Sequence, residues 1–461
     1  MSAPACAGKR NPHNAVAAQT PDREGMRDMD GTAPSQLRAL VTPERVHRSV
    51  YTDPALFELE MARIWGRAWI YVGHESQVKS PGDFFSTRIG RQPVVMVRHS
   101  DGSVRVLYNR CGHRGAMVVA EESGHADAFT CCYHGWRYDT DGRLLSVPLP
   151  DGYGDGFDLS DPALGMVPVA RAASYRGFVF ASLAADGPDL KAFLGHMATS
   201  LDDLVDRAPD GAIALDAGMH RYVYRGNWKL QVENVLDSYH VPFSHASTVN
   251  RKGEQFSRRE GDRTGAKVVA QKKTSDAWKG RRSYVTGPGH GWTSNTALDD
   301  GKRSSPSFDA YRKTLADKVG AARADEILTP QYHNSMIYPN ISIMGLNMHV
   351  RVIKPLAVDL TEVTIYPVRL LGAPDEFNSR NIRLLNVTHS AASFVQTDDL
   401  EAFRRAQEGL QSQQSDWVDI SRGLGEERPD TKYNAVGELA THEMAVRAQY
   451  QAWAEYMGRT G

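Results

Sequence analysis

The sequence predicts an α+β protein, in which a small all-β domain precedes a larger domain that combines an antiparallel sheet with flanking helices. Three observations support this prediction. Short alternating apolar segments joined by Asp-Gly turns occupy residues 82–183, segments of helical period follow residue 188, and alternation returns between residues 341 and 368. A length of 461 residues is enough for two or three domains.

The composition excludes several functional classes. A hydrophobic content of 41% and a charged content of 24% describe an ordinary globular protein, and a net charge of −1 provides no field that favours nucleic acid or an acidic membrane surface. No apolar run approaches the roughly 18 residues of a spanning helix. The four cysteines do not form a disulfide framework, because three of them lie within residues 111–132. We therefore expect a cytoplasmic protein with no nucleic-acid and no membrane partner.

The N-terminal region is expected to lie outside the two domains. Residues 1–44 are rich in Ala, Gly, Pro, Asp and Arg and lack an apolar period, which predicts a disordered or loosely docked leader. Residues 45–69 are predicted to form a helical lead-in that packs on the larger domain, since Asp53 can cap a helix and Pro54 suits its first turn.

The small β domain is predicted over residues 70–187. Strand alternation and turn signals recur through it, at residues 85–89, 94–98, 101–102, 104–108, 141–142 and 177–183. Gly187-Pro188 marks its end. The larger domain then spans residues 188–461, with a closing amphipathic helix predicted at residues 436–457.

Two short loops of the β domain each pair one cysteine with one histidine. Cys111-Gly-His113 is followed, after seventeen residues, by Cys131-Cys132-Tyr133-His134. Thiolates and imidazoles together suit a metal centre. A zinc site could use the same donors, but zinc motifs usually separate a cysteine pair from a histidine pair. The mixture in each loop fits a Rieske [2Fe–2S] centre, in which two cysteines hold one iron and two histidines hold the other.

This spacing, followed by Gly135-Trp136, resembles the Rieske oxygenases, non-haem iron enzymes that hydroxylate aromatic rings. The resemblance implies that Cys111, His113, Cys131 and His134 hold the cluster. The family usually has proline where this chain has Cys132. A Cys132-x-His134 register would mirror the first loop, but the family pattern favours Cys131.

A second polar segment begins at Asn227-Trp-Lys229 and continues to His245. Residues 229–240 predict a helix on which Glu233, Asp237 and His240 share a face. Pro242 would end or kink this helix, so that His240 and His245 could meet at one point. A capping histidine and a surface histidine are the alternative. The order Asp-x-x-His-x4-His resembles the same oxygenases, which implies that His240 and His245 bind a mononuclear iron.

Two histidines need a carboxylate to complete the 2-His-1-carboxylate set of non-haem Fe(II) oxygenases. Asp398 and Asp399 open a helix predicted from Gln396 to Gln411. Asp398 forms a capping-box-like pair with Glu401, which leaves Asp399 to point elsewhere. The family pattern also places the ligand at the second aspartate. We expect Asp399, with Asp398 as the alternative ligand.

The resemblance spans about residues 45–425. The terminal part is similar to the alpha (large) subunits of terephthalate, halobenzoate and salicylate oxygenases, on the evidence of residues 351–355, 371–374, 398–401 and 406–410. It implies a Rieske domain joined to a catalytic domain of the helix-grip type. It also implies one [2Fe–2S] cluster and one mononuclear Fe(II) per chain.

The same resemblance implies that Asp237 bridges His134 of a neighbouring subunit to His240 of its own chain. It therefore predicts a homotrimer, with or without a small beta subunit (α3β3). No flavin or hydride-donor site can be identified, so electrons would come from a separate reductase or ferredoxin.

We hypothesise an aromatic carboxylate as the substrate, together with O2. Arg351 is predicted on a strand face beside His349 and Ile353, where its guanidinium could hold a carboxylate by two hydrogen bonds. A solvent-facing salt bridge is the alternative. The expected reaction is cis-dihydroxylation in aromatic catabolism. A Rieske monooxygenase or demethylase, and a purely electron-transferring Rieske protein, are the alternative functions.

Overall fold

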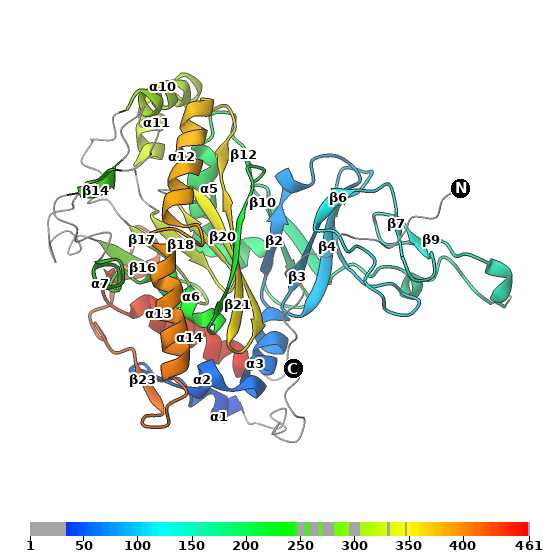
Figure 1. The fold of residues 1–461 in the computed structure, drawn as a ribbon, viewed down its shortest axis with the longest axis horizontal. Coiled ribbons are helices and arrows are strands. Elements are labelled where there is room, and N and C mark those ends of the chain that lie inside the picture. Colours follow the sequence, from blue (N-terminus) through cyan, green and yellow to red (C-terminus); the bar gives the residue numbers. More distant parts are fainter. Residues whose placement is uncertain are drawn as a thin grey trace.

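The computed structural model describes residues 34–154, 156–246, 254–257, 267–269, 281–294, 305–329, 332–345 and 348–459. Most of the expected leader, residues 1–33, lies outside the described residues. The rest of that segment includes α1 (Pro34–Arg38), whose Leu37 is fully buried. Figure 1 shows a smaller β-rich part on the right and a larger mixed part on the left. The predicted α+β class is confirmed.

The lead-in contains α2 (Ser49–Thr52) and α3 (Pro54–Glu60), and α3 continues as a π-helical turn, Met61–Trp65. Asp53 caps α3 as predicted, since its Oδ1 accepts from the Ala55 amide over 2.8 Å. Glu60 ties the lead-in to the larger domain. Its fully buried carboxylate pairs with Lys229 Nζ at 2.5 Å and accepts from the indole N–H of Trp228 at 2.8 Å. A buried ion pair needs such additional hydrogen bonds to offset its desolvation.

The β domain consists of three small antiparallel sheets. Their strand orders are β10-β11-β2, β5-β4-β3-β6 and β7-β8-β9. The strands are β2 (Ile70–His74), β3 (Asp83–Ile89), β4 (Gln92–Arg98), β5 (Val104–Tyr108), β6 (Ser123–His125), β7 (Phe129–Thr130), β8 (Arg137–Tyr138), β9 (Leu144–Ser146), β10 (Arg171–Tyr175) and β11 (Phe178–Ser182). Alternate residues of β4, such as Val95 and Val97, enter a separate small core that also contains Cys111 and Cys131. This core therefore supports both predicted ligand loops.

The larger domain is built on one nine-stranded antiparallel sheet with the order β13-β21-β20-β19-β18-β17-β16-β25-β24. Its strands are β13 (His220–Arg225), β16 (Arg282–Thr286), β17 (His290–Ser294), β18 (Asn334–Ile337), β19 (Ile341–Met344), β20 (His349–Ala357), β21 (Leu360–Pro367), β24 (Arg428–Asp430) and β25 (Ala435–Leu439). The main helices are α4 (Leu190–Leu194), α5 (Ala198–Asp206), α6 (Trp228–Leu236), α7 (Val241–Ser244), α10 (Pro306–Val319), α11 (Ala321–Leu328), α12 (Asp375–Thr388), α13 (Gln396–Gly409) and α14 (Met444–Met457).

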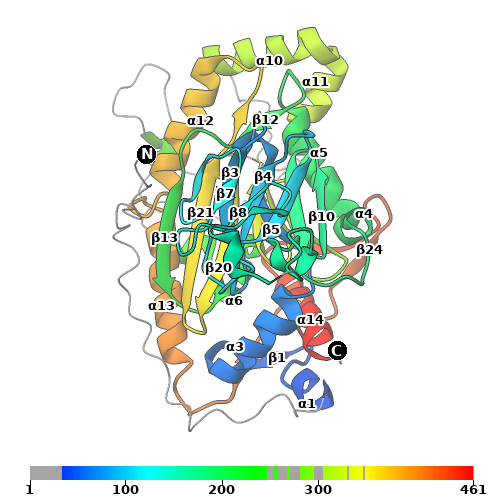
Figure 2. The ribbon, with the colours of Figure 1, turned by 90° about the vertical axis from the view of Figure 1, so that its right-hand side faces the viewer.

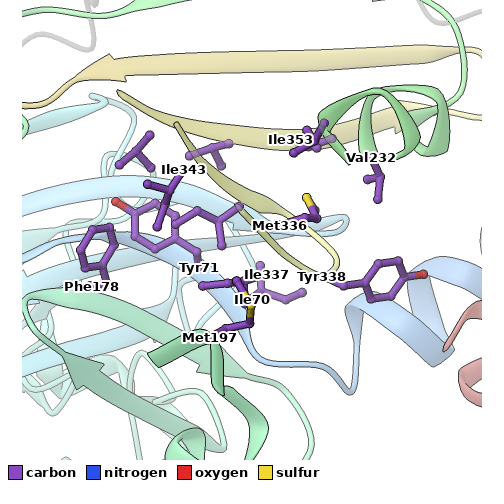
Figure 3. Packing of buried hydrophobic residues seen from close by; sticks show 14 of the residues in the cluster. Ile70, Tyr71, Phe178, Met197, Val232, Met336, Ile337, Tyr338, Ile343 and Ile353 are labelled. Carbon is purple, nitrogen blue, oxygen red and sulfur yellow. The ribbon is translucent and has the colours of Figure 1, made fainter. Parts of the chain in front are cut away.

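The two faces of this sheet have different neighbours. Figure 3 shows Val232 of α6 on the side of Ile353, whereas Tyr71 and Phe178 of the β domain lie beside Ile343. The side chain of Asn340 also bonds both the amide and the carbonyl of Tyr71, at 2.9 Å each. Figure 2 views the molecule with the β domain in front of the sheet. One sheet face thus supports α6, and the other holds the β domain.

The closing helix is shorter than predicted. It begins at Met444, because residues 435–439 instead form β25, which pairs antiparallel with β16, for example Val436 with Val285. Among the described residues, no helix combines the length and the apolar character that crossing a membrane requires.

Candidate metal centres

The two cysteine–histidine loops share one backbone geometry. In each loop the cysteine amide donates over 2.8 Å to the carbonyl five residues later, and the cysteine carbonyl accepts from a glycine amide, Gly115 at 3.1 Å and Gly135 at 3.0 Å. Both glycines have left-handed φ angles, 73° and 70°, which residues with a Cβ rarely adopt. Cys111 and Cys131 therefore hold equivalent positions, which favours Cys131 over Cys132 as the partner of Cys111.

The side chains of these loops separate sulfur from nitrogen. Cys111 and Cys131 are buried, with 2% and 1% of their surface exposed, whereas Cys132 is exposed. The half-buried imidazoles of His113 and His134 lie nearer the surface, with ring centroids 4.6 Å apart. Two adjacent sulfurs on one side and two imidazoles on the other suit a [2Fe–2S] cluster. His113 Nδ1 is buried and has no hydrogen-bond partner among the described residues, as expected of a ligand atom.

Two aromatic residues support the cluster loops: Trp136, which the motif already contained, and Tyr138, which the sequence did not point to. The Tyr138 hydroxyl lies 3.0 Å from Cys111 Sγ and accepts from the Gly112 amide over 3.1 Å. Burial, reinforced by Cys111, raises the pKa of Tyr138, so its hydroxyl keeps its proton and can donate to sulfur. The indole of Trp136 stacks on His113 with centroids 4.9 Å apart and planes 6° from parallel.

The three side chains predicted to bind mononuclear iron converge. One ligand atom from each of His240, His245 and Asp399 can be chosen so that all three lie within 4.8 Å of one another. Asp399 Oδ1 is 3.2 Å from His245 Nε2 and 3.6 Å from His240 Nε2. His245 and Asp399 are 4% and 5% exposed. This donor set leaves open positions on Fe(II) and fits the predicted ion.

Each histidine of this site presents its other ring nitrogen to a carboxylate. Asp237 Oδ2 lies 3.1 Å from His240 Nδ1, and Asp398 Oδ2 lies 3.3 Å from His245 Nδ1. A carboxylate in this place fixes the tautomer and orientation of a metal-binding imidazole. The arrangement assigns the two aspartates of α13 different positions, with Asp399 facing the Nε2 atoms and Asp398 behind His245.

Asn234 is a further member of the site that the sequence analysis missed. Its Nδ2 lies 3.2 Å from both Asp399 Oδ1 and His240 Nε2. The amide thus sits among the three candidate ligands. Its place in the polar segment between Asn227 and His245, one residue after Glu233, was the sequence feature that could have pointed to it.

Two local predictions around this site were wrong. The helix ends at Leu236, four residues earlier than predicted, because Asp237 Oδ1 accepts from the Tyr239 and His240 amides at 2.5 and 3.3 Å. Such side-chain bonds compete with helical ones. Glu233, Asp237 and His240 therefore share no helix face.

Glu233 instead accepts hydrogen bonds from the hydroxyls of Tyr51 and Tyr450, and burial raises its pKa to about 7. Asp398 also forms no capping box. Val395 occupies the N-cap of α13, and Glu401 pairs with Arg404 and Arg405.

The electrostatics of the site favour an ionised Asp399. Burial raises its pKa, but the hydrogen bond with His245 and the charges of His240 and Arg351 more than offset this, so its pKa lies below the ordinary value. Burial lowers the pKa of His245, but the hydrogen bonds and charges of Asp399 and Asp398 raise it by more, so the pKa lies above its ordinary value. The carboxylates are thus arranged to compensate positive charge at the imidazoles.

Arg351 lies on the sheet face predicted for it. It shares this face of β20 with His349 and Ile353, and all three are buried. Only 5% of Arg351 is exposed, so the alternative of a solvent-facing salt bridge was wrong. Its Nη2 donates to Gln396 Oε1 over 3.2 Å, and its charge is near enough to lower the pKa of Asp399.

Comparisons with known proteins give each region a family. The model of the Rieske [2Fe-2S] domain matches residues 68–162, and that of the ring hydroxylating alpha subunit (catalytic domain) matches residues 212–459. The toluate 1,2-dioxygenase subunit alpha of Pseudomonas putida is 37% identical over 382 residues, which cover 82% of this chain and 81% of that protein. The 2-halobenzoate 1,2-dioxygenase large subunit of Burkholderia cepacia is 35% identical over 408 residues, which cover 85% of each.

A solved structure agrees with these matches. Naphthalene 1,2-dioxygenase with indole bound in its active site superposes with a TM-score of 0.77 at 27% identity, over 91% of this chain and 94% of that chain. The first family model covers the cysteine–histidine loops, and the second covers His240, His245 and Asp399.

Proposed function

Because this chain belongs to the ring-hydroxylating dioxygenase alpha subunits, and is therefore an oxidoreductase with a Rieske domain, we propose that it is a terminal oxygenase acting on an aromatic carboxylate. The proposed reaction is cis-dihydroxylation of the ring with O2 and two electrons from a reductase or ferredoxin. The relatives named above are dioxygenase subunits whose names specify toluate and 2-halobenzoate, which supports this substrate class.

Each chain would hold two metal groups. Cys111 and Cys131 with His113 and His134 suit the [2Fe–2S] cluster, and the converging trio of His240, His245 and Asp399 suits Fe(II). When bound, these groups supply electron storage and the reduction of O2. The protein side chains orient them, since Asp237 and Asp398 hold the Nδ1 atoms of the two histidines and Asn234 lies among the ligand atoms.

The electron route would cross between subunits. Figure 1 shows β7, which leads into the second cysteine–histidine loop, at the right of the chain, and α7, between His240 and His245, at the left. Two groups at opposite ends of one chain favour transfer from a neighbouring chain. We propose a homotrimer, with or without a beta subunit, in which Asp237 of one chain meets His134 of the next.

One observation carries the choice of a carboxylate substrate. The Arg351 guanidinium is buried, its Nε has no hydrogen-bond partner among the described residues, and its Nη2 donates to the neutral amide of Gln396. A buried charge without a partner is costly, and a bound carboxylate would supply the partner through two parallel hydrogen bonds. Burial also lowers the pKa of His349 and His389, so Arg351 provides the positive charge here.

Turnover of benzoate, 2-halobenzoates, salicylate, anthranilate and phthalate isomers with a surrogate reductase tests this function. The proposal predicts oxygen uptake with a carboxylate, and two labelled oxygen atoms from O2 in the diol. A single incorporated atom would instead support a monooxygenase. Arg351→Ala should raise KM for the carboxylate about 100-fold, the loss of a charge-assisted bidentate contact.

Arg312→Ala is the matched control, since Arg312 is exposed and pairs with Asp325 on the surface. It should leave KM unchanged. An unchanged KM of Arg351→Ala for every benzoate analogue would remove Arg351 from the substrate site.

A further inference from the structure

Three buried hydrogen-bond donors, one on Arg351 and two on residues near it, have no acceptor among the described residues. They are Arg351 Nε on β20, Gln396 Nε2 at the start of α13 and the Tyr222 hydroxyl on β13. The exposed fractions of the three residues are 5%, 0% and 8%. A native protein leaves few such atoms unsatisfied, because a buried donor without an acceptor loses its hydrogen bonds to water and gains nothing in return. Their gathering from three elements indicates a site built for an acceptor.

The orientation of Gln396 follows from the chemistry of its neighbour. An arginine has only donors, so the atom of Gln396 that faces Arg351 Nη2 must be the carbonyl oxygen Oε1, at 3.2 Å. The NH2 group of Gln396 is thereby fixed as a donor. The backbone amide of Gln396 donates to Ser393 Oγ over 3.1 Å, which holds the residue at the start of α13.

Tyr222 lies on the same sheet face as Arg351. Cross-strand partners share a face, and the register pairs Arg351 with Ile365, Ile365 with His220 and Tyr222 with Val363. Burial raises the pKa of Tyr222, while the charge of Arg351 lowers it and that of Asp399 raises it. The hydroxyl therefore keeps its proton, within electrostatic reach of both Arg351 and the iron-binding carboxylate.

A glutamine at this position has a consequence that a glutamate would not have. Glutamate would give Arg351 an internal counter-charge, and the guanidinium would then need no anion from outside. Glutamine orients the guanidinium and leaves its charge uncompensated. One carboxylate offers about four acceptor positions, which is enough for all three donors.

We propose that Gln396 and Tyr222 determine specificity, with Gln396 presenting Arg351 and both residues donating to the carboxylate of the substrate. This inference rests on the proposed function and extends the carboxylate-binding site from Arg351 alone to three residues that each donate hydrogen bonds to the substrate. A site built to bond a polar group discriminates strongly against analogues that lack it, because its own groups are then left unpaired. Neutral analogues of the same shape should therefore bind poorly to the unmodified protein.

The isosteric variant Gln396→Glu tests the proposal in the full holoenzyme. With benzoate and benzamide as the matched probes, we expect the benzoate-to-benzamide ratio of kcat/KM to fall about 100-fold, mostly through KM for benzoate. The stabilisation of the protein against heat by added benzoate should disappear as well, which is a readout independent of turnover.

A second variant keeps the test decisive if Gln396→Glu does not fold. Tyr222→Phe removes only a hydroxyl that has no hydrogen-bond partner among the described residues, and should lower the same ratio about tenfold, the loss of one hydrogen bond of about 1.4 kcal/mol. An unchanged ratio in both variants, alongside a raised KM in Arg351→Ala, would overturn the role of Gln396 and Tyr222 in binding the carboxylate and leave the proposed function standing. Failure of the unmodified enzyme to bind or oxidise any carboxylate would overturn both.

Discussion

The two candidate metal centres are built in opposite ways. The cluster loops come from one stretch of chain, residues 111–136, and matched backbone hydrogen bonds around Gly115 and Gly135 shape them. The iron site joins the α6–α7 region to α13, and His245 and Asp398 are more than 150 residues apart in the sequence. Side-chain carboxylates orient its histidines. A local backbone motif needs little of the fold, whereas a site assembled from distant elements depends on it.

Exposure differs in the same way. The cluster histidines are half-buried at the surface of the β domain, while His245 and Asp399 are almost fully buried. An electron can leave through an exposed imidazole, but activation of O2 benefits from a site that excludes water. The contrast predicts that carboxylate variants damage the iron site selectively.

The largest effect is expected from Asp237, the residue proposed to connect the two centres of neighbouring chains. Asp237→Ala should lower coupled turnover about 100-fold while both metals stay bound, because it removes the proposed bridge between His240 and His134 of the neighbouring chain. Product formation and iron content of the same preparation measure this. Asp237→Asn is the matched variant, since its carbonyl can still accept from the Tyr239 and His240 amides. Full activity in Asp237→Ala would defeat the proposed bridge.

Glu233 provides a test of stability against pH. Its pKa is raised from 4.5 to about 7 in the folded protein, so the stability linked to its protonated form is complete below the unfolded pKa and lost as pH rises through about 7. A glutamine side chain does not titrate and has no such dependence. We expect Glu233→Gln to gain up to roughly 3 kcal/mol relative to the unmodified protein between about pH 5 and about pH 8.

Unfolding curves at the two pH values would show this gain, with the cluster absorption unchanged in the folded state. The same pH dependence in both proteins would mean that Glu233 keeps its ordinary pKa. A loss of the cluster spectrum with pH in the folded protein would contradict the expectation that titration of Glu233 does not affect the cluster in the β domain.

The carboxylate behind His245 should matter for metal affinity. Asp398→Asn is expected to weaken iron binding about 10–100-fold and to leave the cluster intact, because a neutral amide oxygen replaces the charged acceptor at the imidazole Nδ1. Equilibrium dialysis against ferrous ion would measure this. Glu401→Gln is the control on the same helix, since Glu401 pairs only with surface arginines in the described residues. Equal iron affinity in both variants would make Asp398 a bystander.

The smallest effect concerns the cluster alone. The Tyr138 hydroxyl donates to Cys111 Sγ, and a donor to sulfur stabilises the more negative, reduced cluster. Tyr138→Phe should lower the reduction potential by roughly 40 mV, on the basis of about 1 kcal/mol for the bond and about 59 mV per 1.4 kcal/mol for one electron. A spectroelectrochemical titration gives the value, and an unchanged potential would exclude the bond.

The same contrast explains what could be predicted from the sequence. The cluster residues lie close together in the chain, so spacing alone indicated their common site. His240, His245 and Asp399 were predicted through resemblance, and the structure brings them together. The early end of α6, the place of Asp398 and the contact of Gln396 with Arg351 could not be predicted, because each depends on a side chain from a distant element or on a local bond that competes with the helix.

Mössbauer spectroscopy of anaerobically purified, isotopically enriched protein tests the central claim most directly, when the unmodified chain and Asp399→Ala are compared. Two cluster irons for each high-spin ferrous ion are expected in the unmodified chain, and only the ferrous signal should vanish in the variant. A colourless protein loaded with zinc, or a ferrous signal that survives Asp399→Ala unchanged, would contradict the account.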